Sequence, residues 1–450
     1  MDYDVVIIGG GPAGSSAGQA AAAEGADALV VEKGVPREDR EGLGPDSTDA
    51  AGILDYWVDI MDLDEPVPEW VKHRELSGAD FVGPTETVSL DSTGMESSYP
   101  NFGFTMHRAR FDDWLRERAE DAGAEYRVGT GVREVDSELV GEPSHTVVLK
   151  DGTELECRYL VLADGPQRTI TGEVLDPLLP DGQFDQLAST TANHIAYQEY
   201  REIPDELYEP DRLKFWWGYM PGHTAYPWVF PNDGNVARVG LTMPIDLDLA
   251  EVADREKYRL LRPDDERVPQ GKVYLERLVE AVYPDYTIDD FPLQTDRGKA
   301  RGTETYPISS TQPIESPVDA NVAVVGGAMG ATSAFHEGGD HVAVRTGALA
   351  GRLAALGALK AYNREWHRAI GDEVLRNVAM ADIVHDFGPD DWDRVFGVVN
   401  AIMPDDGMYD TKDAAFAGVE GLKLYLRYRW RKYGYRKGRY AQIREDDYAV

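Results

Sequence analysis

Residues Tyr3–Gly14, with the sequence YDVVIIGGGPAG, decide the fold. The continuous apolar run at the start of this stretch is typical of a strand buried in a parallel sheet. It leads directly into a glycine-rich turn, and the Ala-rich segment 15–24 predicts a helix after that turn. A second buried strand is expected at 28–31, and it ends at Glu32. The start of the chain therefore predicts a β-α-β unit.

The glycines of this turn have the spacing Gly-x-Gly-x-x-Gly. Gly9 permits a tight turn, Gly11 lets the backbone approach a pyrophosphate, and Gly14 lets the helix pack closely against the strand. The helix N-terminus directs its partial positive charge at the same place. Glu32 would accept hydrogen bonds from an adenosine ribose; the alternative is a glycine turn without a ligand. The predicted dinucleotide contacts are Gly9, Gly11, Pro12, Ala13, Gly14, Glu32 and Lys33.

The composition favours a large, very acidic protein. The chain has 450 residues, of which 42% are hydrophobic, enough for two or three domains with sizeable cores. Acidic residues number 81 against 45 basic ones, and the net charge of −36 disfavours a nucleic-acid partner. Only 12 of the basic residues are lysines. Many carboxylates with few lysines are typical of a cytosolic protein from a high-salt, haloarchaeal-like organism, because salt screens the self-repulsion.

The single cysteine, Cys157, excludes an internal disulfide and a cysteine-based metal centre, and we predict no metal site. No segment approaches the roughly 18 apolar residues that a membrane span requires. The N-terminus lacks the basic segment of a signal peptide. We therefore expect a cytoplasmic protein, peripheral at most on the inner face of the cell membrane.

Four further motifs follow the glycine turn along the chain. Arg108 precedes a predicted helix, and Asp164 with Gly165 follows an apolar strand. The segment 326–330, GGAMG, follows another apolar strand, and 335–339, FHEGG, stands at a helix start. This set, in this order, resembles the flavin-binding fold of the aromatic hydroxylases and the geranylgeranyl reductases across residues 1–375. The resemblance implies FAD rather than NAD at the glycine turn.

The resemblance also implies which residues would contact the flavin. Backbone N–H groups of Gly338 and Gly339 are well placed to stabilise negative charge on a reduced flavin. Gly327 departs from the family, which has Asp there to bind the ribityl chain, and the family's cysteine in the region 40–50 is absent. Glu337 stands where the family has Gly. The implied contacts are Arg108, Asp164, Gly165, Gly327, Gly330, Gly338 and Gly339.

Two neighbouring residues, His336 and Glu337, are candidate proton donors, because both would lie near the flavin. A surface or capping role is the alternative for either.

The segment Tyr226–Pro231, YPWVFP, resembles the Y-x-W-x-F-P signature of geranylgeranyl reductases, which lines their substrate cavity. Aromatic faces suit an isoprenoid chain, since they offer apolar area and attract a developing carbocation. The alternative is that these aromatics form an ordinary sheet core. The candidate substrate contacts are Tyr226, Trp228, Phe230 and Trp217.

The predicted fold class is α/β, with an inserted antiparallel-sheet domain. A Rossmann-like FAD-binding domain is expected from 1–60, 105–170 and 296–345, a substrate or cap domain from 61–104 and 171–295, and a helical C-terminal region from 346–450. Weak periodicity between 33 and 105 predicts mostly long loops, with one element around 57–70.

The segment 421–444 combines basic and aromatic residues, including Trp430, and fits either a strand or a helix. It either packs on the acidic body as a solvated element or anchors the protein to anionic lipids.

The predicted function is reduction of carbon–carbon double bonds in an isoprenoid, geranylgeranyl-type lipid by an FAD-dependent oxidoreductase. One alternative is a flavin monooxygenase acting on an aromatic or polyene substrate. Another is a flavin-free lipid-binding peripheral protein. The sequence leaves the electron donor open between NAD(P)H and ferredoxin.

Overall fold

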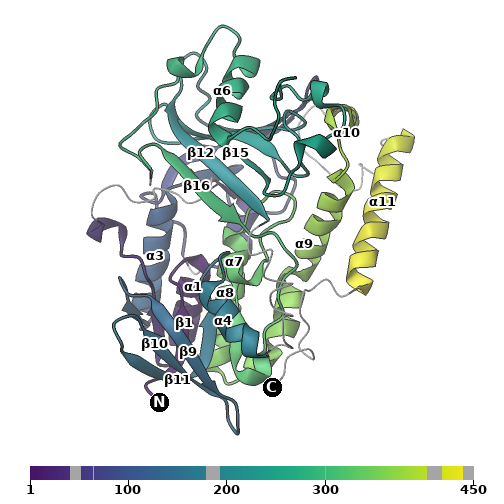
Figure 1. Ribbon diagram of the computed structural model, residues 1–450. Helices are drawn as coiled ribbons and strands as arrows, with labels where there is room; N and C mark the ends of the chain where they lie inside the picture. The colour runs from purple at the N-terminus through teal and green to yellow at the C-terminus, as the bar shows by residue number, and fades with distance from the viewer. Residues whose placement is uncertain (41–51, 64, 179–192, 299, 403–417, 439–450) are drawn as a thin grey trace.

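The computed structural model describes the chain except for residues 41–51, 64, 179–192, 299, 403–417 and 439–450. Figure 1 shows two lobes, each built around a large sheet, with long C-terminal helices along one side. The predicted fold class is confirmed: a Rossmann-like lobe, a largely antiparallel sheet inserted into it, and a helical C-terminal region.

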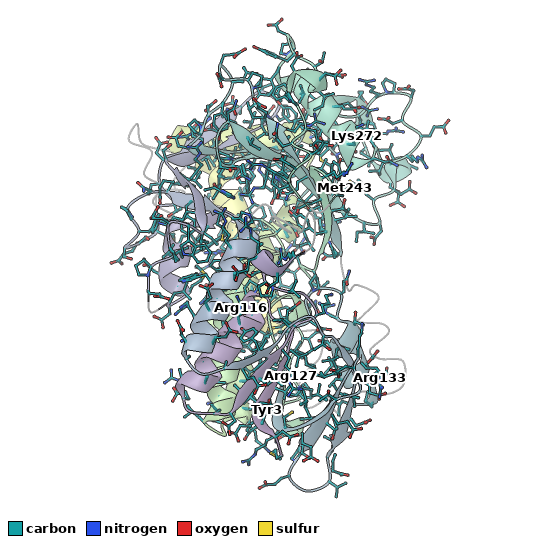
Figure 2. All side chains as sticks on the ribbon, turned by 90° about the vertical axis from the view of Figure 1, so that its left-hand side faces the viewer. Tyr3, Arg116, Arg127, Arg133, Met243 and Lys272 are labelled. Atoms are coloured by element: carbon teal, nitrogen blue, oxygen red, sulfur yellow. The ribbon has the colours of Figure 1, made fainter. Side chains whose placement is uncertain are left out.

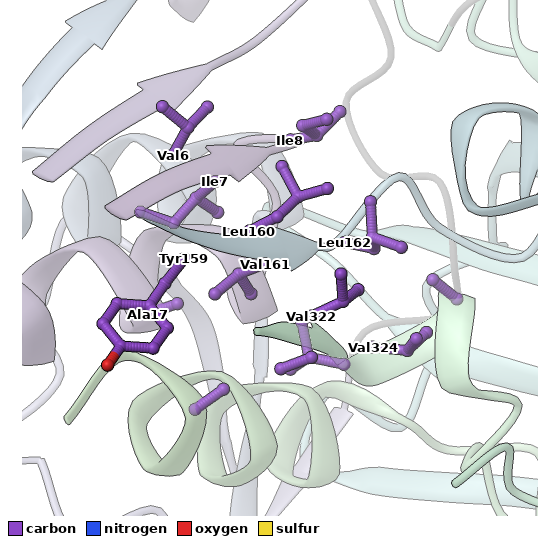
Figure 3. Packing of buried hydrophobic residues seen from close by; sticks show 14 of the residues in the cluster. Val6, Ile7, Ile8, Ala17, Tyr159, Leu160, Val161, Leu162, Val322 and Val324 are labelled. Atoms are coloured by element: carbon purple, nitrogen blue, oxygen red, sulfur yellow. The ribbon is translucent and has the colours of Figure 1, made fainter. Parts of the chain in front are cut away.

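The first lobe is built around a mixed sheet with the strand order β8-β2-β1-β11-β10-β9. Its long strand β11 pairs antiparallel with β10 through its first half and parallel with β17 through its second half. Figure 3 shows the buried aliphatic side chains of β1, β11 and β17 packed together. The strands are β1 (Tyr3–Ile8), β2 (Ala28–Val31), β8 (Glu125–Arg127), β9 (Val132–Glu138), β10 (Ser144–Leu149), β11 (Glu154–Leu162) and β17 (Val322–Val324).

Three helices pack in this lobe: α1 (Pro12–Ala23), α3 (Arg108–Asp121) and α8 (Asp340–Ala355). The backbones of α1 and α8 touch, since a Cβ at Gly347 or Gly351 would overlap the backbone carbonyls of Ala13 or Ala17. This contact fixes the N-terminal parts of both helices at one edge of the sheet. The short helices α4 (Thr169–Leu175) and α7 (Gly326–Met329) begin at the same edge, after β11 and β17.

The second lobe contains a sheet with the order β16-β12-β15-β14-β13-β5-β6, antiparallel except for the pair β13 and β5. Helix α6 (Gly271–Val282) covers one face, which we call the outer face. The other, inner face carries the aromatic residues of β14. The strands are β5 (Gly78–Val82), β6 (Thr87–Leu90), β12 (His194–Glu202), β13 (Arg212–Trp216), β14 (Tyr226–Pro231), β15 (Val236–Pro244) and β16 (Thr303–Ile308).

The prediction of long loops between 33 and 105 is wrong. Strands β3 (Gly52–Leu54), β7 (Gly103–Met106) and β4 (Lys72–Leu76) form a small third sheet, and β5 and β6 join the second one. These strands have three to five residues, and all but β6 include a glycine or charges, so their alternation is too short to recognise. The predicted element around 57–70 is the shorter helix α2 (Asp55–Ile60).

The C-terminal region contains α9 (Tyr362–Val384), α10 (Pro389–Ile402) and α11 (Gly418–Lys437), so the basic tail is a helix rather than a strand. Helix α11 lies along α9, where Lys432 pairs with Asp372 at 2.8 Å and Arg431 with Asp382 at 3.1 Å. Short 3-10 helices are Arg37–Asp39, Asp176–Leu178, Leu249–Glu251, Arg255–Lys257, Ile288–Asp290, Val318–Ala320 and Leu359–Ala361.

Figure 2 shows the molecule from the side, with Tyr3 and Arg133 on the first lobe and Met243 and Lys272 on the second. None of the helices in the described ranges combines the length and apolar character needed to cross a bilayer.

Candidate functional site

The glycine turn lies between β1 and α1, at the edge of the sheet where its parallel strands end. Gly9 has a φ of 104°, and a Cβ there would overlap the carbonyl oxygen of Ala163 at the end of β11. A Cβ at Gly14 would overlap the carbonyl oxygen of Gly9. Gly11 differs, because a Cβ there would have no neighbour within 4 Å. Gly9 and Gly14 are therefore required by the fold, whereas the space before Gly11 is open.

This open space fits the phosphates of a dinucleotide. No side chain caps α1, and its first turn contains no acid, so its terminal N–H groups face the space unneutralised. The Glu32 carboxylate accepts hydrogen bonds from the N–H groups of Gly10 and Gly34, both at 2.6 Å, which holds it beside the turn. Lys33, next to it, is exposed. The turn residues predicted from the sequence are thus together in space.

Asp164 and Gly165 follow β11 and lie next to this turn. The Asp164 carboxylate accepts hydrogen bonds from the N–H groups of Ile170 at 2.7 Å and Thr171 at 3.1 Å. Gly165 has a φ of 80°, which starts the turn toward α4. Asp164 therefore caps α4 and fixes the loop beside the dinucleotide space.

Arg108 connects the starts of α3 and α8. Its Nε donates to Asp112 at 2.9 Å, and its guanidinium lies 3.4 Å from the carboxylate of Asp340. Asp340 directly follows Gly339, the N-cap residue of α8, which has no side-chain cap. The N–H of Gly338 is already used, because it donates to Nδ1 of His336 at 3.2 Å.

The structure gives a reason why Gly327 in α7 replaces the Asp that the family has at this position. A Cβ at Gly327 would lie 3.2 Å from Cδ of Pro166, so the family's Asp would be crowded by a rigid ring. Arg168, which sequence reasoning missed, lies buried beside this helix and donates to the Ala328 carbonyl at 2.7 Å. Burial lowers the pKa of Arg168 to about 10, against the opposing effect of Asp164, so the guanidinium remains charged at neutral pH. The charged group beside α7 is thus the buried guanidinium of Arg168, rather than the family's aspartate.

Glu337 is buried between the two lobes. Its side chain is only 4% exposed, and its Oε1 accepts hydrogen bonds from Thr224 at 3.4 Å and Ser310 at 3.5 Å. Burial raises the pKa of Glu337 to about 8, although these two hydroxyls favour the ionised form. Its Oε2 has no hydrogen-bond partner among the described residues. Because Oε1 accepts from two hydroxyls, the proton of the neutral acid belongs on Oε2, where it can be donated.

His336 differs from Glu337 in the direction of its pKa shift. Its ring packs against Trp57, with ring centroids 5.4 Å apart. Burial, together with the nearby His341, lowers the pKa of His336 to about 3. The ring is therefore neutral at neutral pH and already accepts the Gly338 N–H through Nδ1. Of the two candidate acids, only Glu337 is protonated as an acid at neutral pH and has an oxygen atom, Oε2, that makes no hydrogen bond to the described residues.

Sequence reasoning missed the residues that surround Glu337. His194 on β12 lies 3.8 Å from Oε1 through its Nδ1, and its Nε2 is 3.1 Å from the hydroxyl of Thr224. Burial lowers the pKa of His194 to about 4, so it carries no charge that would ionise the acid. Ser310 follows β16. These residues are far apart in the chain, so no sequence spacing connects them.

The predicted aromatic residues reach this acid from β14. Tyr226, Trp228 and Phe230 share the inner face of the sheet, and the Tyr226 hydroxyl donates to the His336 carbonyl at 2.8 Å. The Trp228 indole lies across Gly240, where a Cβ would come within 2.6 Å of the ring. The ring of Trp217 lies 4.5 Å from that of Tyr226. We call Tyr226, Trp228 and Phe230 the aromatic row.

Comparison with known proteins agrees with this geometry. Residues 2–176 match the family of FAD binding domains. The chain is 26% identical over 392 residues to digeranylgeranylglycerophospholipid reductase 2 of Methanopyrus kandleri, a match that covers 82% of this chain and 84% of that protein. The solved structure of a geranylgeranyl bacteriochlorophyll reductase-like protein from Thermoplasma acidophilum has a TM-score of 0.70 at 21% identity, and the match covers 95% of this chain and 99% of that one. A myxobacterial chondrochloren halogenase has a TM-score of 0.58 at 16% identity, over 96% and 97% of the two chains.

The predicted cofactor, FAD, is confirmed by the domain match and by the fit of the glycine turn. The halogenase shares the fold alone, since its identity to this chain is low. The chain is therefore an FAD-dependent oxidoreductase that is similar, over most of its length, to digeranylgeranylglycerophospholipid reductase.

Proposed function

We propose that the protein reduces carbon–carbon double bonds of an isoprenoid lipid and that Glu337 donates the proton. The observation that carries this proposal is a buried, neutral carboxyl group next to one end of the aromatic row. FAD, when bound and reduced by an electron donor, would supply the hydride. The chain's own residues place the apolar substrate, exclude water and deliver the proton.

The aromatic row gives an isoprenoid chain a rigid apolar surface. Trp228 and Phe230 belong to the buried apolar cluster on the inner side of the sheet, and aromatic rings attract a positive charge that develops on an alkene. The row ends at Tyr226, whose hydroxyl is bonded to the carbonyl of the residue before Glu337. A double bond at this end of the row would be next to Glu337, so the row sets the position at which the proton is delivered.

The test is a reduction assay on the FAD-loaded protein in molar salt. A geranylgeranylated glycerophospholipid is incubated with the protein and a chemical reductant, and mass spectrometry should detect two added hydrogens for each reduced double bond. NAD(P)H and reduced ferredoxin are then compared as donors. Oxygen-dependent consumption of NAD(P)H with an oxygenated product would overturn the proposal and favour a monooxygenase.

We also propose that α11 binds an anionic membrane surface. Its inward face packs on the body through Leu424 and Tyr428, whereas its outward face is open. That outward face carries Leu422, Leu426, Trp430 and Tyr433, each between 45% and 68% exposed. Basic residues flank this apolar stripe. An exposed apolar stripe bordered by cations is typical of a helix that lies in a bilayer interface.

Replacing Leu426 and Trp430 together by Ser is expected to abolish vesicle binding at 1 M salt. At this salt the screening length is about 3 Å, so attraction of Lys423 and Arg427 to anionic headgroups is weak and apolar insertion supplies most of the affinity. Cosedimentation with phosphatidylglycerol vesicles measures the fraction of protein that is bound. Trp70→Ser, at a tryptophan that is 44% exposed elsewhere, is the matched control and should still bind. Equal binding by the double variant would exclude α11 as the contact.

A further inference from the structure

Arg238 on β15 is a buried cation without a partner. The residue is 0% exposed, and Nε and both terminal nitrogens lack a hydrogen-bond partner among the described residues. The other buried arginine of this sheet, Arg201, is different, because it pairs with Glu199 at 2.6 Å and donates to the Phe291 carbonyl at 2.6 Å. A buried unpaired charge strongly destabilises a folded protein. The guanidinium therefore requires a negatively charged ligand.

The surroundings of Arg238 also offer donors. Arg238 faces Phe230 across the strand pair, and Asn232 directly follows the end of β14, where its N–H donates to the Val236 carbonyl at 2.8 Å. Nδ2 of Asn232 and Nε2 of His73 are both buried and lack a partner in the described part of the chain. Burial and the charge of Arg238 lower the pKa of His73 to about 3, so this ring is neutral. Donors without acceptors, grouped around one cation, suit an oxyanion.

Nearby acids are already engaged. Asp233, next to Asn232, is bound by Arg297 in a two-pronged ion pair. Glu304 accepts hydrogen bonds from Gln198 at 2.8 Å and from Tyr200 at 3.2 Å. Neither carboxylate makes a hydrogen bond to Arg238. A hydrogen-bond acceptor for the Arg238 guanidinium must therefore come from outside the described chain.

Arg238 and Glu337 lie at opposite ends of the aromatic row. Tyr226, at one end, is bonded to the carbonyl of His336, and Phe230, at the other end, is paired with Arg238. The two ends are four residue steps apart along the strand, which is roughly 13 Å. A ligand that spans the row would have its reacting double bond at one end and an anionic group at the other.

We propose that Arg238, with Asn232 and His73, binds the phosphate group of an amphiphilic isoprenoid substrate. This assignment rests on the proposed function, since it identifies the polar end of the same ligand. A guanidinium binds a phosphate with two parallel hydrogen bonds, and a phosphate removes the unpaired charge. FAD also contains phosphates, so the experiment must separate the two sources.

The first test is thermal unfolding of the FAD-loaded protein with inorganic phosphate at constant ionic strength. Phosphate should raise the unfolding temperature of the wild type by about 2 °C or more. Arg238→Met should remove this shift and unfold at a higher temperature than the wild type without phosphate, because an unpaired charge is gone. Arg201→Met, the matched control, should lose stability but keep the shift.

The outcomes distinguish the sources of phosphate. A shift in the loaded wild type that Arg238→Met abolishes supports a substrate subsite. A shift seen only without FAD, and abolished by the same variant, shows that the cofactor occupies the position and overturns the substrate assignment. An equal shift in wild type and Arg238→Met overturns the site altogether.

The second test compares two substrates, a geranylgeranyl phospholipid and geranylgeraniol, which has no phosphate. Arg238→Met should raise KM for the phospholipid by roughly tenfold or more and leave KM for the alcohol unchanged. Arg238→Lys keeps the charge but cannot form the two parallel hydrogen bonds of a guanidinium, so its KM for the phospholipid should be intermediate. If the wild type reduces neither substrate, the proposed function fails, whereas the phosphate shift remains an independent result.

Discussion

Replacing Glu337 by Gln is expected to lower kcat for double-bond reduction by about 10²- to 10⁴-fold, the usual contribution of a positioned general acid. Gln has nearly the same shape and can still accept hydrogen bonds from Thr224 and Ser310, but its amide cannot donate a proton to carbon. FAD content, read from the flavin absorption bands, should be unchanged. Single-turnover reduction of the lipid, measured after chemical reduction of the protein, gives the rate.

The pH dependence of the rate provides the control. Burial raises the pKa of Glu337 to about 8, so the wild type should lose activity as the pH rises through 8 and the acid ionises. Glu337→Gln should lack this loss. His336→Asn should keep both the rate and the profile, because the pKa of His336 is lowered to about 3 and the ring is neutral throughout. An alkaline loss of activity that survives in Glu337→Gln would assign the proton to another group.

Stability should change with pH through the same carboxyl. The folded protein binds a proton on Glu337 up to about pH 8, whereas an unfolded chain releases it near the ordinary value of 4.5. The stabilisation from this proton is therefore complete below 4.5 and is lost as the pH rises toward 8. Unfolding temperatures of the wild type should fall relative to those of Glu337→Gln over this interval. Parallel curves would show that the carboxyl is ionised in the fold.

The parts of the fold that could be predicted from sequence are those with local signals. The apolar strand Tyr3–Ile8 and the glycine turn after it were predictable because adjacent residues determine both the strand and its turn. The aromatic row was predictable because alternation places Tyr226, Trp228 and Phe230 on one face of β14. In both cases the local structure depends on residues that are adjacent or alternate in the sequence, so the sequence pattern alone predicts it.

The environment of Glu337 could not be predicted in this way. Its neighbours His194, Thr224 and Ser310 come from three separate segments, and their approach depends on how the inserted sheet packs on the first lobe. The direction of its pKa shift depends on that burial as well. Arg238 gives no local signal either, since an arginine in an alternating strand would ordinarily point to solvent. The environments of Glu337 and Arg238 are both determined by packing between segments that are far apart in the sequence.

Replacing Gly11 by Val is expected to leave folding intact and to weaken FAD binding by roughly a hundredfold or more, because the side chain would occupy the space in front of the helix N-terminus. The fold itself does not need this glycine. Its φ of −73° suits any residue, and an added Cβ has no neighbour within 4 Å. FAD affinity is measured by flavin fluorescence titration, and folding by circular dichroism of the FAD-free protein.

Gly14→Val is the matched control for this prediction, because it adds the same side chain three residues further along the same turn. There a Cβ would overlap the carbonyl oxygen of Gly9, so the helix would be forced away from β1 and the FAD-free protein itself should unfold at a lower temperature. The two variants therefore separate the ligand's need for glycine from the fold's need. If Gly11→Val bound FAD as tightly as the wild type, the pyrophosphate could not lie against this turn, and the uncapped start of α1 would need another anion to explain it.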